Sequence, residues 1–314
     1  MKFRTALAVE SFSFQLTYRD PLCFLGSCFS ENMSEKFAYL GFNSLVNPHG
    51  TLFGAHALLE NLRRAVLQDN IPENEIVQFN GKWSHLFSHS SLSAGTREAL
   101  LSNIQRADES LKHQLNMAKV CFITLGSAWV YRHKNTGLVV GNCHKIAGDQ
   151  FEKFLQTPDE IQAYLNRMLV LLQRVNPDLK VVFTVSPVKH IRDGLVENNL
   201  SKSTLLLAVN QLVKSSFQSF YFPAFELLTE DLRDYRFYAE DLAHPNDLAI
   251  NYIWERLREV IFDEKQEALN NRVIKLRKAM EHRPFDPNTE ESKLFQLNLQ
   301  QQLEALVDET GIRL

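Results

Sequence analysis

The sequence predicts an α/β protein: a three-layer sandwich with a flavodoxin-like, mostly parallel central sheet, followed by a helical appendage at the C-terminus. Three apolar runs, at residues 22–25, 120–125 and 180–185, are continuous rather than alternating, which is typical of parallel strands covered on both faces. Helical periodicity separates the runs, and small or polar residues follow them. This alternation indicates a doubly wound sheet, in which ligands bind at the carboxyl ends of the strands.

The first strand and the first helix meet in a short turn. The run 22–25 ends at Gly26, and apolar residues recur at helical spacing from Ser30 onward. The hydroxyl of Ser27 and the thiol of Cys28 are therefore predicted to lie at a helix N-terminus. There the unpaired N–H groups and the positive end of the helix dipole favour a thiolate or a developing oxyanion, so we expect a lowered pKa at Cys28.

The remaining elements are predicted from periodicity and from turn residues. In order, they are a strand at 44–46, helices at 54–67 and 96–116, the strand at 120–125, a helix at 158–175, the strand at 180–185, a helix at 201–215, a strand at 220–223 and a helix at 247–260. Residues 131–150 are predicted to form a polar excursion after the strand at 120–125. Residues 70–93 are predicted to form a long irregular stretch. A loop of that length inside a compact domain is usually functional.

The composition changes near residue 262. Beyond it, two charged or glutamine-rich amphipathic patterns, at 265–279 and 290–307, predict helices separated by a break that contains two prolines. We therefore divide the chain into a domain over residues 1–262 and a helical extension over residues 263–314. The extension is expected to pack on the domain or to join two copies of the chain in a homo-oligomer.

Charge and hydropathy exclude several classes of partner. The chain has 314 residues, of which 23% are charged, and its formal net charge is −3, so neither nucleic acid nor an anionic membrane is expected as a partner. No apolar stretch reaches the length of a membrane span. The N-terminal residues show no apolar core of a signal peptide.

The four cysteines, Cys23, Cys28, Cys121 and Cys143, have no CxxC spacing and are too sparse for a disulfide scaffold. They predict reduced thiols in a cytoplasmic protein. The histidines match no standard zinc pattern such as HExxH, so we expect neither a metal site nor another cofactor.

A second cluster with chemical potential lies near the end of the domain. Asp241 and His244 are three residues apart and precede Pro245. This spacing lets the carboxylate accept the Nδ1 proton of the imidazole and fix its tautomer. The Nε2 atom then faces a nucleophile that is delivered from another strand end.

Together, the Gly-Ser-Cys turn and the Asp-x-x-His pair resemble the SGNH/GDSL hydrolases, and within them the GSCFA-domain family. That family is named for the motif that stands here as Gly-Ser-Cys-Phe-Ser at residues 26–30. Further family-like segments lie at residues 47–50, 125–131, 141–145, 184–190 and 234–241. The resemblance covers about residues 20 to 260, and it implies an SGNH-hydrolase-like fold and a hydrolase site for ester bonds.

Beside the general Gly-Asp-Ser motif of these enzymes, Cys28 stands where the nucleophilic serine would be and Ser27 where the aspartate would be. The resemblance thus implies Cys28 as the nucleophile, with Ser27 as its rival. His244 would be the general base, assisted by Asp241. A Cys28 that only packs in the core is the remaining alternative.

The groups that would bind an oxyanion remain open. The resemblance implies three donors: the N–H of the nucleophile, a glycine N–H after the second strand and an asparagine side chain after the third. Gly50 suits the second, but Ala128 stands at the asparagine position, and losing one such donor typically costs about 3 kcal/mol. The candidates for oxyanion or substrate binding are Gly50, Asn47, His49, Gly126, Ser127, Trp129, His144 and His190.

We therefore predict a hydrolase or acyltransferase that acts on an ester or thioester of a small-molecule or glycan substrate. The alternative is a catalytically impaired protein of the same fold that keeps the pocket to bind a ligand. A redox-sensing thiol is a third interpretation, and it requires Cys143 to lie beside Cys28.

Overall fold

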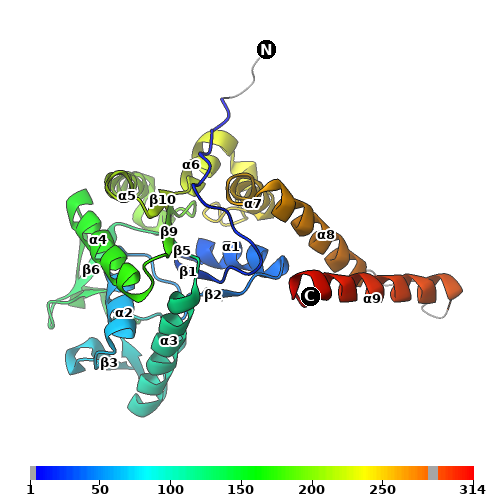
Figure 1. The fold of residues 1–314 in the computed structure, drawn as a ribbon. Coiled ribbons are helices and arrows are strands. Elements are labelled where there is room, and N and C mark those ends of the chain that lie inside the picture. Colours follow the sequence, from blue (N-terminus) through cyan, green and yellow to red (C-terminus); the bar gives the residue numbers. More distant parts are fainter. Residues whose placement is uncertain (1–4, 282–288) are drawn as a thin grey trace.

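Five parallel strands form the centre of the protein (Figure 1). In the computed structural model, which describes residues 5–281 and 289–314, they lie in the order β2-β1-β5-β9-β10. Their bounds are β1 Leu22–Gly26, β2 Ser44–Val46, β5 Val120–Leu125, β9 Lys180–Val185 and β10 Ser219–Tyr221. Numbered along the chain, these strands run 2-1-3-4-5, which is the flavodoxin-like order. The predicted α/β class and the parallel sheet are confirmed.

Helices cover both faces of the sheet and complete the three layers (Figure 1). One layer holds α1 and α7, and the other holds α2, α3, α4 and α5. Their bounds are α1 Cys28–Tyr39, α2 Ala55–Leu67, α3 Arg97–Met117, α4 Pro158–Val175, α5 Leu195–Ser215, α6 Ala224–Glu226 and α7 Asp247–Ile261. A π-helical turn, Leu227–Leu232, follows α6. Most of the predicted helix bounds are thus confirmed to within one or two residues.

The alternation of side chains along β1 explains why one short strand supports two cores. Phe24 faces the layer of α1 and α7, where its ring stacks on Phe122 of β5 with ring centroids 4.7 Å apart. Cys23 and Leu25 point to the opposite layer. Because every residue of β1 is buried, the strand reads as a continuous apolar run.

Residues 70–93 are not irregular, so that prediction is wrong. They contain an antiparallel hairpin of β3, Ile76–Phe79, and β4, Lys82–His85. Asn80 and Gly81 connect the strands, both with positive φ, as a two-residue hairpin turn of type I′ requires. The Asn-Gly pair was the local signal for this hairpin, and short polar strands around it hid the period-2 pattern.

The segment 131–150 is also more regular than predicted. A three-stranded antiparallel sheet occupies this region, in the order β7-β6-β8. Its strands are β6 Trp129–His133, β7 Val139–Val140 and β8 Phe151–Leu155. These strands are short and partly exposed, so they give no continuous apolar run. The predicted start of α5 at residue 201 is wrong too, because the helix begins at Leu195, after Gly194 with φ of +95°.

Two further helices, α8 Glu264–Glu281 and α9 Glu290–Thr310, follow α7. Val273 of α8 and Leu306 of α9 are buried in the same apolar cluster as α1 and α7. Figure 1 shows α9 reaching outward from this contact. The predicted proline break lies within residues 282–288, outside the described residues, and the division at residue 262 stays a prediction. No described helix is both long and apolar enough to span a membrane.

The backbone around Gly26 leaves no room for even one methyl group, which predicts a large loss of stability on substitution. Gly26 has φ of +121°, and a Cβ atom there would lie 2.0 Å from the carbonyl oxygen of Thr124. Gly26→Ala should lower the free energy of unfolding by at least about 3 kcal/mol or prevent folding, because both the φ angle and the space exclude a side chain.

Urea denaturation measures this effect, and Gly95→Ala is the matched control. Gly95 has no atom within 4 Å of an added Cβ, so its substitution should change the stability by no more than about 0.5 kcal/mol. A Gly26→Ala chain with parental stability would contradict the close approach.

Candidate active site

The turn after β1 presents the thiol and buries the hydroxyl. Ser27 is 1% exposed, and its Oγ accepts a hydrogen bond from the Phe29 N–H at 3.3 Å as the N-cap of α1. The Ser27 N–H donates to the Thr124 carbonyl at 3.0 Å, which fixes the turn to β5. Cys28 is the first residue of α1 and is only half-buried. The predicted strand-to-helix turn is therefore present, and Cys28 is the more exposed of its two candidate residues.

The prediction of a lowered pKa at Cys28 is wrong. Burial raises the pKa of the Cys28 thiol, and the carboxylate of Glu31 raises it further. The N–H groups of Cys28 and Phe29 and the ammonium of Lys202 act in the opposite direction but do not outweigh burial. Cys28 is thus a neutral thiol at pH 7 and needs a base in order to react.

Glu31 is held by the loop that follows β2. One carboxylate oxygen of Glu31 accepts hydrogen bonds from Asn47 Nδ2 at 3.0 Å and from Thr51 Oγ1 at 2.7 Å. The side-chain oxygen of Asn47 accepts the Gly26 N–H at 2.9 Å. Asn47, a predicted oxyanion donor, therefore clamps the turn to the loop instead of leaving its amide free.

The other predicted donors at this edge also bond to protein atoms. The Gly50 N–H donates to the Asn47 carbonyl at 2.7 Å, and the N–H groups of Gly126 and Ser127 both donate to the Phe53 carbonyl. Trp129 Nε1 donates to the Glu197 carbonyl at 3.1 Å. These groups build the edge of the site, and none of them is an unoccupied donor.

Ala128, at the position where the resemblance implies asparagine, is fully buried, and its N–H donates to Ser201 Oγ at 2.8 Å.

The predicted pair of Asp241 and His244 is formed. His244 Nδ1 and Asp241 Oδ2 are 2.5 Å apart, and the other carboxylate oxygen accepts the N–H groups of Ala243 and His244 at 3.0 Å each. The two backbone hydrogen bonds, together with the imidazole, lower the pKa of Asp241 to about 2. Both side chains are about half exposed. Within the described chain, His244 makes no hydrogen bond to Cys28.

His190 lies near this pair, after β9. Its Nε2 atom is buried without a hydrogen-bond partner in the structure, and its ring meets the ring of Phe53 edge-on at 5.0 Å. Burial, and then the positive charge of Lys202, lowers the pKa of His190 to about 4. The imidazole is therefore neutral at pH 7, as a hydrogen-bonding group in a substrate pocket would be.

Sequence analysis missed Lys202. This lysine is 1% exposed, and its Nζ atom donates to the carbonyl oxygens of Gly126 at 2.7 Å and Ser186 at 2.9 Å. Burial lowers the pKa of Lys202 to about 7, while the charge of Cys28 acts in the opposite direction. The signal was its spacing from Leu205 and Val209, which places Lys202 on the inward face of α5.

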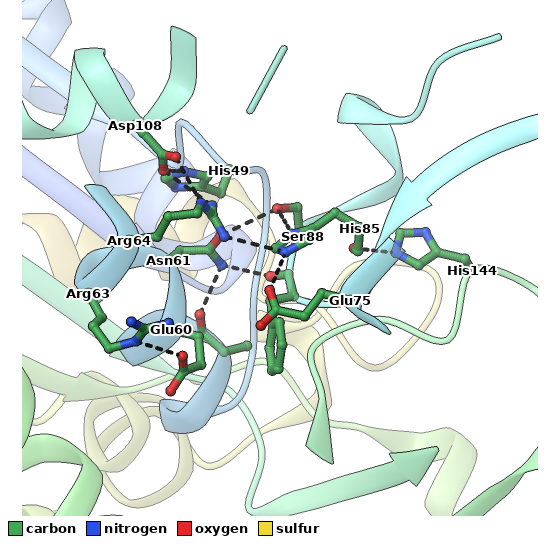
Figure 2. Close-up of polar contacts among 12 residues, drawn as sticks. His49, Glu60, Asn61, Arg63, Arg64, Glu75, His85, Ser88, Asp108 and His144 are labelled. Carbon is green, nitrogen blue, oxygen red and sulfur yellow. Dashed lines mark hydrogen bonds and ion pairs between the residues drawn. The ribbon is translucent and has the colours of Figure 1, made fainter. Parts of the chain in front are cut away.

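The predicted site residues His49 and His144 belong to a separate buried network (Figure 2). His49 Nε2 bonds to Asp108 at 2.7 Å, and the same carboxylate accepts Arg64 Nε at 2.8 Å. His144 Nε2 bonds to the carbonyl of His85 at 2.8 Å. The network ties the loop after β2 to α2, the β3–β4 hairpin and α3.

Hydrogen bonding and burial together set the charges in this network. Burial alone would raise the pKa of Asp108, but the hydrogen bonds from His49 and Arg64 lower it overall. His85 bonds to Glu75 at 3.0 Å and to Ser88 at 2.8 Å, and burial keeps its pKa well below the ordinary value. The network therefore supports the loop next to Cys28 and does not itself face that thiol.

A cleft of about 660 Å³ opens on the outer side of the Arg64–Asp108 pair, between α2 and α3. Charged and amide side chains line most of it, and neither Cys28 nor His244 reaches it. Across the described residues, no three His, Cys, Asp or Glu side chains gather as metal ligands. The four cysteines are free thiols.

The fold and this edge define an α/β protein with a cysteine at the first strand-to-helix turn and a His–Asp pair beyond the fifth strand of the sheet. The GSCFA family matches residues 21–257, and the C-terminal domain of GSCFA domain proteins matches residues 273–310. The chain therefore belongs to the GSCFA family. No curated protein matches it.

Solved structures show distant likenesses. One is a provisionally assigned platelet activating factor from Streptococcus pneumonia, with 14% identity and a TM-score of 0.42 over 77% of this chain and 88% of the other. Another is a provisionally assigned GDSL-like lipase from Parabacteroides merdae, with 14% identity, a TM-score of 0.41 and coverage of 79% and 97%. A carbohydrate esterase family 3 protein from Talaromyces cellulolyticus shares 9% identity, with a TM-score of 0.36 and coverage of 82% and 98%. Likenesses this distant assign no function to the chain.

The buried histidines predict that the protein loses stability in mild acid. Burial lowers the pKa values of His49, His56, His85, His144 and His190. Below the unfolded pKa of about 6.5, the unfolded chain binds more protons than the folded one. The free energy of unfolding should then fall by up to about 1.4 kcal/mol per pH unit for each such histidine.

Urea denaturation at pH 7.5 and pH 5.5 measures this slope. His56→Gln keeps a donor for the Val140 carbonyl and should reduce the slope, whereas His113→Gln on the exposed face of α3 should leave it unchanged. A stability that stays level or rises toward pH 5.5 would rule out the neutral buried histidines.

Proposed function

We propose that this protein is a hydrolase or acyltransferase that acts on ester bonds through the thiol of Cys28. The observation that carries the proposal is the contrast between two neighbours: Ser27 is 1% exposed and serves as a helix cap, whereas Cys28 is only partly buried. Cys28 is the first residue of α1 and lies at the carboxyl ends of β1 and β5, where the strand order reverses. This is the position at which open α/β sheets bind their ligands.

In the proposed mechanism, the Cys28 sulfur attacks the carbonyl carbon of an ester, and the thiol proton passes to His244 Nε2. Asp241 accepts a hydrogen bond from the Nδ1–H group of His244, which holds the tautomer and stabilises the imidazolium. The tetrahedral intermediate expels the alcohol, which takes the proton from His244 and leaves a thioester on Cys28. Water or an acceptor hydroxyl then attacks the thioester, gives its proton to His244 and frees the sulfur, which regains that proton.

The raised pKa of Cys28 fits this sequence of steps. A thiol that is neutral at pH 7 must lose its proton during attack, so a general base is required. His244 is half exposed and makes no hydrogen bond to Cys28 in the described residues, so the mechanism requires the two groups to approach each other when substrate binds. Hydrogen bonds of this kind are often formed only in the complex with substrate. We propose a small molecule or glycan that carries an acyl group as the substrate.

A second candidate function is ligand binding without turnover. It is favoured by the oxyanion donors, because Gly50, Ser127 and Trp129 all bond to protein atoms and Ala128 lacks a donor side chain. Saturable binding of an acyl ester that is recovered unchanged, in a chain with an unmodified Cys28, would support this function over catalysis.

Substitutions at the two neighbouring residues test the nucleophile. Hydrolysis of p-nitrophenyl acetate should fall at least about 1000-fold in kcat/KM for Cys28→Ala, since the attacking atom is removed. Ser27→Ala should keep kcat/KM within about tenfold of the parent, while its free energy of unfolding falls by about 1 kcal/mol through loss of the cap.

His244→Ala should lower kcat/KM by about 100- to 10,000-fold, the usual contribution of a general base. His113→Ala, at an exposed position on α3, is the control for the loss of an imidazole. Activity that survives in Cys28→Ala but is lost in a folded Ser27→Ala would reject the thiol mechanism.

A further inference from the structure

Lys202 is a buried cation at the edge of the proposed site. It reaches from α5 to the carboxyl ends of two neighbouring strands, where Nζ donates to the carbonyls of Gly126 and Ser186 at 2.7 and 2.9 Å. An ammonium group has three donors. Its third N–H finds no acceptor in the part of the chain that the structure describes.

The cation also has no acidic partner. No Asp or Glu of the described residues lies within ion-pair distance of Lys202, although the side chain is 1% exposed. A buried charge without a counter-ion is costly to the folded state, and lysine is rarely buried in this way. Two strand-end carbonyls could be held by a neutral amide at lower cost, so a buried amine that is protonated below about pH 7 needs an explanation.

The fold brings the Lys202 ammonium group close to Cys28, at the carboxyl ends of β1 and β5, a region called this corner below. Gly26 of β1 pairs with Thr124 of β5, and the Ser27 N–H donates to the Thr124 carbonyl. Cys28 and Gly126 each follow this pair by two residues. Lys202 holds the Gly126 carbonyl, so its Nζ atom and the thiol share the ends of two adjacent strands.

Electrostatic coupling between the two groups supports this placement. The Lys202 charge opposes the raised pKa of Cys28, and the Cys28 charge opposes the lowered pKa of Lys202. Other titratable groups face the same corner. Glu31 acts on Cys28, and Lys202 and His244 both act on His190. Among these groups, Lys202 is the only one that favours the thiolate through its charge.

We propose that Lys202 is a catalytic residue whose ammonium group stabilises the negative charge formed at Cys28, first on sulfur and then on the oxygen of the tetrahedral intermediate. This inference rests on the proposed function and supplies the side-chain donor that Ala128 lacks. A charged donor forms a hydrogen bond roughly twice as strong as a neutral one. Negative charge at Cys28 raises the pKa of Lys202 and so favours its ammonium form.

The test compares Lys202→Gln with the parent and with Lys214→Gln, an exposed position on the same helix. Glutamine keeps two N–H donors for the two carbonyls and removes the charge. Alkylation of Cys28 by iodoacetamide is followed by peptide mass from pH 5 to 10, and thermal unfolding checks that each full-length variant is folded.

At pH 6.5, below the pKa of about 7 at Lys202, alkylation of Cys28 should be about tenfold slower in Lys202→Gln than in the parent, which corresponds to one pKa unit. The parental rate should also level off near pH 7, where Lys202 loses its proton, and this inflection should be absent from Lys202→Gln. Lys214→Gln should match the parent. Ester hydrolysis by Lys202→Gln should fall by about 100- to 1000-fold in kcat, as for loss of an oxyanion donor.

A folded Lys202→Gln with the parental pH profile would overturn the inference and leave Lys202 as a structural contact between strand ends. If Lys202→Gln does not fold, Lys202→Met decides by the same titration, because replacing a buried charge with an apolar side chain is often neutral or stabilising. A parent that hydrolyses no ester, with a Cys28 profile that still depends on Lys202, would reject the proposed function and keep the electrostatic role.

Discussion

The close approach of the Gly26 backbone to the Thr124 carbonyl is the constraint on which the site depends. It leaves no room for a side chain at Gly26, and it allows the Ser27 N–H to bond to the same carbonyl. The chain then turns directly from β1 into α1, so that Cys28 is the first helical residue. A looser turn would move the thiol away from the end of β5 and from Lys202.

Charge at this corner is set by burial rather than by the helix terminus. A helix dipole acts as a partial charge that water screens easily, whereas removing a thiol from water disfavours its ionised form directly. Glu31, held by Asn47 and Thr51, adds to that effect. In the proposed mechanism, the resting protein holds a neutral thiol, and His244 and the Lys202 charge together make it reactive. Such a site would react with a bound substrate and resist oxidation in the absence of substrate, because the neutral thiol is less reactive than the thiolate.

The class of fold could be predicted from local sequence, because buried parallel strands give continuous apolar runs. The Asp241–His244 pair could also be predicted, because its two residues lie within one turn of the chain. The β3–β4 hairpin had a local signal too, in Asn80 and Gly81, but short polar strands weakened it. The acceptors to which the expected oxyanion donors bond could not be predicted from the sequence. Trp129 bonds to the carbonyl of Glu197, far away in the sequence, and only the tertiary structure brings such partners together.

Lys202 illustrates the same limit. Its position on the apolar face of α5 was visible in the sequence, but its two acceptors lie on different strands, and their approach depends on the sheet order. The pKa of Cys28 was mispredicted because the balance between burial and nearby charge requires the packed structure. By contrast, the capping role of Ser27 is a local property of helix starts and separates the two candidate nucleophiles.

The most direct test of the account is to trap the acyl-enzyme. The parent chain, mixed with p-nitrophenyl acetate and quenched in acid within the first turnover, would be analysed by intact mass and peptide mapping. A thiol nucleophile at Cys28 predicts one added acetyl group on the peptide that contains it, released again on incubation in neutral buffer. An acetyl group on Ser27, or hydrolysis with no covalent intermediate on this peptide, would contradict a thiol nucleophile at Cys28.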